Sequence, residues 1–288
     1  MKRKYDLVKA SILLIVNFIL FCLLFRMEWA IGITVIIALV SYLGEFSSLA
    51  RDRAIPLRNM DAYYKEKLES AFQIVCEQGL NVGIDLQHLR LYMIPDDRIQ
   101  GRSYGFTNIS VTKGLLAVDE VSIAACLARE SGHCLQAHGF IKRILFCDTT
   151  IVMLLLSGMG IISTGFVWII FGLLCFCGVC GGVLSFYMTG IIGKIIRGIF
   201  RGFQHIVLFI YQITLGFVSR SMEYSADRFA AKKLDFGNEL SFFLNRFAVE
   251  DGYPKTLRDI IYASHPVPYK RIAKIEQYGY ATLPQEVK

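Results

Sequence analysis

Four long stretches of the chain carry no Lys, Arg, Asp or Glu. One of them, residues 203–218, contains Gln204, His205 and Gln212, which favour a buried or bundle-facing helix over a further lipid-exposed span. The other three alternate with polar segments. They cover residues 10–25, 29–44 and 149–193. A membrane-spanning helix needs about 20 apolar residues. Each of the first two stretches therefore predicts one span, lengthened at its end by Lys9 or Glu45, and the third predicts two spans with a turn near residues 163–165. A signal peptide is the competing interpretation of the first stretch, but a second apolar stretch follows it and no small-residue cleavage site does.

Basic residues flank these apolar stretches. They are Lys2, Arg3, Lys4, Arg51, Arg53 and Arg58 around the first pair of spans, and Lys142, Arg143, Lys194, Arg197 and Arg201 around the second pair. The positive-inside rule places such flanks in the cytoplasm. The pattern therefore predicts two hairpins with four transmembrane helices, and polar segments that face the same compartment.

The polar segments show the helical spacing and strand alternation of a folded domain. Residues 61–79 repeat apolar positions at helical spacing and end at a glycine, whereas residues 89–93 and 109–112 alternate like strands. Asp119 is a good N-cap for a helix that we expect to end at Gly139. The expected fold class is mainly α with a small β-sheet (α+β).

We expect four parts along the chain. Transmembrane hairpins occupy residues 1–45 and 144–193, and a cytosolic domain is assembled from residues 46–143 and 194–288.

Composition and charge agree with a membrane protein. The chain is 54% hydrophobic and 19% charged, with a mean hydropathy of +0.47. The net charge of +7 requires no nucleic acid, because Lys and Arg gather at the edges of the apolar stretches, where acidic phospholipid of the bilayer is a sufficient partner. The eight cysteines form neither a disulfide pattern nor a zinc knuckle, which fits a reducing cytosolic face.

One predicted helix carries residues typical of metal-dependent hydrolysis. Its residues 129–133 read Arg-Glu-Ser-Gly-His. A zinc protease helix needs two ligands four residues apart, so that both imidazoles leave one face, with a general-base Glu beside the first. Arg129 and His133 hold the ligand positions, and Glu130 holds the base position. By itself a Glu-x-x-His pair is more typical of a solvated helix face or a salt-bridged core.

Two downstream segments stand where a third ligand and a transition-state histidine would be required. They are Ser-Arg-Ser-Met-Glu-Tyr-Ser-Ala-Asp at 219–227 and Ser-His-Pro at 264–266, followed by Arg271. With them the chain resembles the HtpX-like membrane zinc metallopeptidases, relatives of the type I CAAX prenyl proteases. That family has an H-E-x-G-H helix, a hydrophobic hairpin after it, an E-x-x-A-D helix and a late His-Pro. Residues 92–97, residues 111–116 and the four-span layout are similar as well.

The resemblance implies a gluzincin-like metallopeptidase domain with zinc as its cofactor. His133 and Glu223 would be zinc ligands, and Glu130 would be the general base. Asp227 would steady the site by a hydrogen bond, and His265 would reach the oxyanion. Two alternatives stay open: Asp227 as a surface carboxylate paired with Arg228 or Lys232, and His265 in a helix N-terminal turn before Pro266.

The resemblance also implies a strand that binds substrate. Ile109, Ser110, Val111 and Thr112 would form the edge of the sheet that receives an extended peptide by backbone pairing. Gln100 would be a substrate contact, at a position where the family has an Asn.

Arg129 is the more serious departure from the family, because it stands at the first zinc-ligand position. A guanidinium stays protonated and offers no lone pair to a metal. His138, five residues after His133, would leave another side of the helix, and Cys126, seven residues before it, would lie about 10 Å away along the axis. Neither replaces the missing ligand.

A cation at the metal position also opposes metal binding directly. Two unit charges about 4 Å apart interact by roughly 4 kcal/mol at an effective dielectric constant of 20. We therefore expect the guanidinium of Arg129 to take the place of the metal and to pair with Glu223 and Glu130, joining the two helices by a salt bridge.

These observations support three hypotheses about function. The first is a pseudo-peptidase that keeps a peptide-binding cleft at the cytoplasmic face and binds a peptide or a membrane protein. The second is an active zinc metalloendopeptidase that cleaves membrane or misfolded proteins in quality control. In the third, Arg129 is an engineered or variant position in an otherwise normal enzyme. The resemblance implies the bacterial plasma membrane, with both termini in the cytoplasm.

Overall fold

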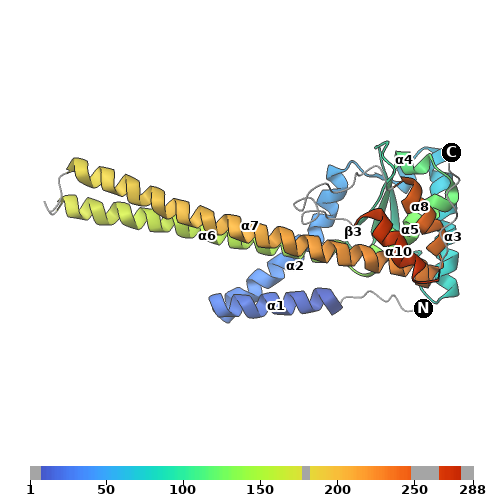
Figure 1. Ribbon diagram of the computed structural model, residues 1–288, viewed down its shortest axis with the longest axis horizontal. Helices are drawn as coiled ribbons and strands as arrows, with labels where there is room; N and C mark the ends of the chain where they lie inside the picture. Colours follow the sequence, from blue (N-terminus) through green and yellow to red (C-terminus); the bar gives the residue numbers. More distant parts are fainter. Residues whose placement is uncertain (1–7, 177–181, 248–265, 280–288) are drawn as a thin grey trace. The chain divides into compact units, whose positions relative to one another are not determined.

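The computed structural model describes residues 8–176, 182–247 and 266–279. The chain divides into two compact units, one of Met1–Ile144 with Leu215–Lys288 and the other of Leu145–Thr214. The fold is mainly helical with one small mixed sheet, and this part of the expected class is confirmed (Figure 1).

Three of the described helices are long and apolar enough to cross a membrane. The three apolar segments are Met27–Arg51, His138–Phe176 and Phe186–Leu234, and a shorter apolar helix covers Val8–Leu23.

The first unit contains the sheet and most of the helices. In chain order its elements are α1 (Val8–Leu24), α2 (Met27–Arg51), β1 (Ile55–Pro56), the 3-10 helix η1 (Leu57–Asn59), α3 (Ala62–Asn81), β2 (Arg90–Ile94), β3 (Gly101–Tyr104), β4 (Asn108–Thr112), α4 (Lys113–Leu116), α5 (Glu120–Leu135), α8 (Gly237–Phe247) and α10 (Pro268–Glu276). The predicted helix at 61–79 and the strands at 89–93 and 109–112 are therefore present, with small shifts at their ends.

The sheet has the order β1-β2-β4-β3. β2 and β4 are parallel, and β1 and β3 are antiparallel to their neighbours. The expectation that residues 109–112 form an edge is therefore wrong, because β4 pairs on both sides. Among the described strands the edges are β1 and β3, and β3 pairs with β4 from Gly101↔Val111 to Tyr104↔Asn108.

α5 lies at the centre of this unit. It contacts β3 and β4, and it also packs against α3 and α8. Asp119 caps the helix as predicted, because its carboxylate accepts a hydrogen bond from the Ser122 amide at 2.8 Å. The predicted end at Gly139 is wrong: α5 ends at Leu135, and Ala137 takes the left-handed conformation with φ 55°. A new helix, α6 (His138–Phe176), then begins.

The second unit consists of parts of two long helices, α6 and α7 (Gly182–Leu234). Within it they lie side by side, and the Gln204 amide donates to the Ser157 hydroxyl at 2.7 Å. The expected turn near 163–165 is wrong, because α6 continues through these residues. The Thr164 hydroxyl donates to the Gly160 carbonyl at 2.8 Å, a bond that satisfies a polar side chain inside a helix.

Candidate functional site

The helix that carries residues 129–133 and the helix that carries Glu223 pass close to each other. A Cβ atom on Gly132 of α5 would lie 2.9 Å from a ring carbon of Phe229 on α7. Glycine therefore permits an approach that a larger residue would obstruct. It brings the side chains of α5 and α7 together although they are far apart in the sequence.

Arg129 occupies the space between these helices. Its Nη1 donates to Glu130 Oε1 at 2.7 Å, and its Nη2 donates to the Glu223 carboxylate. Its Nε lies 3.5 Å from Asp227 Oδ1. The ion pairs that the sequence predicts between Arg129 and the carboxylates of Glu223 and Glu130 are confirmed.

A second arginine completes what we call the charged cluster, namely Arg129, Glu130, Glu223, Asp227 and Arg271. Arg271 of α10 binds Asp227 through two hydrogen bonds of 2.7 and 2.6 Å, and its Nη1 lies 3.9 Å from Glu223 Oε2. Asp227 is buried. Its interpretation as a surface carboxylate is therefore wrong.

Arg271 has no role in the sequence-based interpretation. The only sequence signal for Arg271 was its position after the His-Pro pair. Its contact with Asp227 forms only when α10 folds back against α7, and no local pattern predicts that packing.

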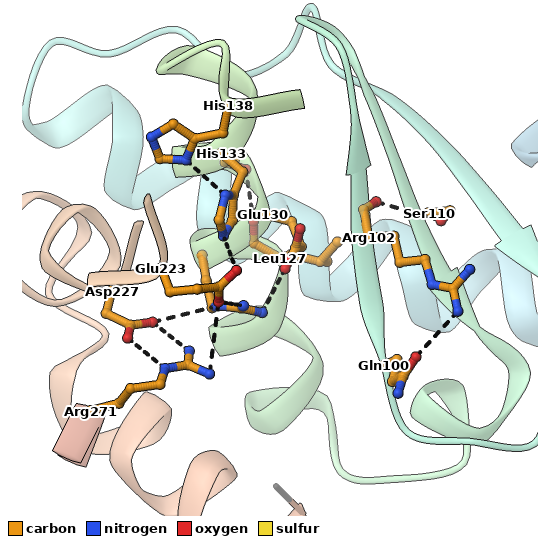
Figure 2. Close-up of polar contacts among 12 residues, drawn as sticks. Gln100, Arg102, Ser110, Leu127, Glu130, His133, His138, Glu223, Asp227 and Arg271 are labelled. Atoms are coloured by element: carbon orange, nitrogen blue, oxygen red, sulfur yellow. Dashed lines mark hydrogen bonds and ion pairs between the residues drawn. The ribbon is translucent and has the colours of Figure 1, made fainter. Parts of the chain in front are cut away.

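His133 faces a partner that the helical spacing did not predict. Its Nδ1 lies 2.8 Å from His138 Nδ1, and its Nε2 lies 3.7 Å from Glu223 Oε1. An unbroken helix would have turned His138 to another side. The left-handed residue Ala137 separates the two helices and returns His138 to the side of His133, as Figure 2 shows.

The pKa values in the cluster follow from burial and from neighbouring charge. Burial would lower the pKa of Arg129, but the carboxylates of Glu223, Glu130 and Asp227 outweigh it and raise that pKa. Burial raises the pKa of Glu130, although the Arg129 charge acts against it. Burial also lowers the pKa of His133. At pH 7 the charged guanidinium of Arg129 therefore lies near a neutral imidazole, that of His133.

The edge strand β3 lies along the α5 side of the cluster. Ser103 lies near the Glu130 carboxyl and favours its charged form, and Gly101 is so close to α5 that a Cβ atom there would press on Cys126 and Glu130. Gln100 and Arg102 are farther from the cluster in Figure 2, where Gln100 Oε1 accepts from Arg102 Nη2 at 3.4 Å. The structure therefore does not bring Gln100 together with the charged cluster.

The residues at this site do not fit a zinc ion. Zinc requires lone pairs from about three protein ligands. His133 and Glu223 are adjacent, but the Glu223 carboxylate accepts from one guanidinium and faces a second. Among the residues described, no group of three His, Cys, Asp or Glu side chains is arranged to hold a metal. His265 lies outside the described residues, so its predicted role stays a prediction.

Comparisons with known proteins agree with the resemblance seen in the sequence. The model of peptidase family M48 matches residues 82–278. Among solved structures, the chain is similar to the crystal structure of S. mikatae Ste24p, with 19% sequence identity and a TM-score of 0.47. The match covers 94% of this chain and 64% of that one, so the chain spans about two thirds of the length of that structure. No curated protein matches the chain.

Proposed function

Because the chain belongs to peptidase family M48, we propose that it is a membrane-bound pseudo-peptidase, which keeps the metallopeptidase fold and binds peptide without hydrolysing it through zinc. The proposal rests on the guanidinium of Arg129. This group donates to both Glu130 and Glu223, the proposed general base and the proposed third zinc ligand. Peptide hydrolysis by zinc needs the lone pairs that these bonds use.

The proposed peptide site is the free side of β3. Edge strands accept extended peptides through backbone hydrogen bonds, and β3 pairs with β4 along one side only in the described part of the sheet. Its Gly101 and Ser103 lie against Glu130. A peptide added to β3 would therefore run beside the charged cluster.

An active zinc endopeptidase is the second candidate, because Glu130, His133, Glu223 and Asp227 all remain at one place. In that case Arg129 would have to leave the carboxylates before zinc enters. In either case we propose that the charged cluster faces the cytoplasm of a bacterial cell, since basic residues such as Arg51, Arg53 and Arg58 follow α2.

Metal content and activity of the purified full chain test the proposal. The unaltered chain and Arg129→His are loaded with zinc and dialysed, and the bound metal is measured by mass spectrometry. Casein cleavage is then measured with and without a chelator. We expect near-stoichiometric zinc and chelator-sensitive cleavage in Arg129→His alone, because only that variant restores two imidazoles four residues apart.

The double variant Arg129→His/Glu130→Gln is the matched control. It should keep the zinc of Arg129→His but lose the cleavage, because the general base is removed. Near-stoichiometric zinc and chelator-sensitive cleavage in the unaltered chain would establish the active endopeptidase instead. Binding of labelled casein to the unaltered chain tests whether the protein binds peptide. Failure to bind would refute a peptide-binding role for casein-like chains.

A further inference from the structure

A polar hollow of about 680 Å³ lies beside the end of α2. It is lined by Arg51, the turn after it, the segment that follows β2, and Arg102 of β3. Side chains alternate between the two faces of a strand. Gly101 and Ser103 meet Glu130 on α5, so Arg102 is directed to the other face. The hollow is therefore separate from the charged cluster.

Four charges in the hollow neutralise one another in pairs. Arg102 lies 3.0 Å from Asp52, and Arg98 lies 2.6 Å from Asp96. Three further charged residues line the same hollow: Arg51, Arg53 and Asp97. Within the described residues their side chains have neither a hydrogen bond nor an ion pair. The hollow thus offers two free guanidinium groups and one free carboxylate.

Arg53 stands at a backbone position that glycine usually occupies. α2 ends in a Schellman motif, in which the Ala54 amide donates to Leu49 O at 3.0 Å and the Arg53 amide donates to Ala50 O at 3.2 Å. Arg53 has a φ of 51°, a conformation that costs a residue with a Cβ atom more than it costs glycine. Position 53 therefore carries an arginine although its backbone conformation favours glycine.

The free groups match a headgroup with one phosphate and one ammonium. Guanidinium groups bind phosphate oxygens through paired charge-assisted hydrogen bonds, and a carboxylate accepts from an ammonium. Arg51 is also the last residue of a candidate membrane span, and basic residues at the ends of such spans favour the headgroup region. α2 exposes Leu39, Leu43 and Phe46 by about half, at spacings of four and three residues that place them on one face.

We propose that this hollow binds the headgroup of phosphatidylethanolamine, with the phosphate at Arg51 and Arg53 and the ammonium at Asp97. The lipid chains then lie against the exposed apolar face of α2. This site is independent of the proposed pseudo-peptidase function, because it uses none of the residues of the charged cluster.

Native mass spectrometry of the full chain in detergent micelles tests the proposal. Phosphatidylethanolamine and phosphatidylglycerol are titrated separately, and the lipid-bound fraction is measured. We expect Arg53→Gly to weaken phosphatidylethanolamine binding about tenfold, the effect of losing one charge-assisted contact. This variant cannot simply fail to fold, since glycine suits the backbone at position 53 better than arginine does.

Two more variants complete the test. Asp97→Asn should weaken binding of phosphatidylethanolamine but not of phosphatidylglycerol, because only the first has an ammonium group. Arg58→Ala, which removes an exposed charge outside the hollow, should change neither. Unchanged phosphatidylethanolamine binding in Arg53→Gly would overturn the site, and equal effects of Asp97→Asn on both lipids would overturn the assigned headgroup. Water-soluble glycerophosphoethanolamine binding as tightly as the lipid would overturn the membrane source.

Discussion

Arg129 donates to two carboxylates that a zinc peptidase would turn toward its metal and its water. The guanidinium of Arg129 keeps its charge although it is shielded from solvent, because the carboxylates of Glu223, Glu130 and Asp227 surround it. Arg271 adds a second positive charge from α10, so two guanidinium groups face three carboxylates. At this scale the site is a network of ion pairs, and its stability depends on every member being present.

Removal of the Arg129 charge should therefore destabilise the fold. We expect Arg129→Met to lower the free energy of unfolding by about 3–5 kcal/mol, because it leaves buried carboxylates without their partner. Arg90→Met is the control: Arg90 is exposed at the start of β2, and a surface change of this kind stays within about 0.5 kcal/mol. Thermal or denaturant unfolding in detergent provides the measurement. Equal stability of the two variants would contradict a structural role for Arg129.

Among the elements, the β3–β4 hairpin connects the site to a membrane helix. Glu45 of α2 is buried and accepts hydrogen bonds from Asn108 and from the backbone of Phe106 and Thr107. Gly105 lies in the same turn with a φ of 60°. The end of α2 thus holds the turn of the hairpin, and the other strand of that hairpin contacts Glu130 through Ser103.

A pair of glycine variants isolates this contact. Gly105→Ala would place a Cβ atom on the Glu45 carboxylate, whereas Gly83→Ala, with a similar φ of 75°, would meet open space. We expect Gly83→Ala to cost about 1 kcal/mol from its backbone alone. Gly105→Ala should cost roughly 1–3 kcal/mol more, from overpacking. Denaturant unfolding measures both, and equal costs would show that Glu45 moves aside freely.

For the whole molecule, the long helices decide how the chain meets a membrane. Three described helices have the length and hydropathy of membrane spans, and α1 is shorter. α6 and α7 each pass from the unit that holds the charged cluster into the second unit. The proposed peptide site at β3 and the proposed lipid site at the end of α2 both lie in the first unit.

Fusions of reporter proteins in a bacterial host test the proposed orientation. A green fluorescent protein fused after residue 288 should fluoresce, and alkaline phosphatase at the same place should be inactive, because the basic flanks keep this end in the cytoplasm. A truncation after Phe176, the last described residue of α6, should give the reverse pattern. An active phosphatase at residue 288 would contradict the proposed cytoplasmic location of the charged cluster.

Periodicity and local chemistry were sufficient to predict α3, β2, β4 and the Asp119 cap. These features depend on residues that are close in the chain, since helical spacing, strand alternation and a capping side chain each act over a few positions. The same signals were insufficient at the end of α5, because one left-handed residue, Ala137, ends the helix without a glycine. The edge of the sheet was missed for a related reason, since alternation within β4 does not show that β3 covers its other side.

Motif spacing was likewise enough to identify the family and to pair Arg129 with Glu223, because the family pattern states which distant segments meet. It did not reveal Arg271 against Asp227, His138 against His133, or the hollow at the end of α2. These contacts join residues whose separation in the chain carries no signal, as the separation of 44 positions from Asp227 to Arg271 illustrates. Local patterns specify what each segment can form, whereas packing selects which buried charges meet, and here that selection places a guanidinium between Glu130 and Glu223.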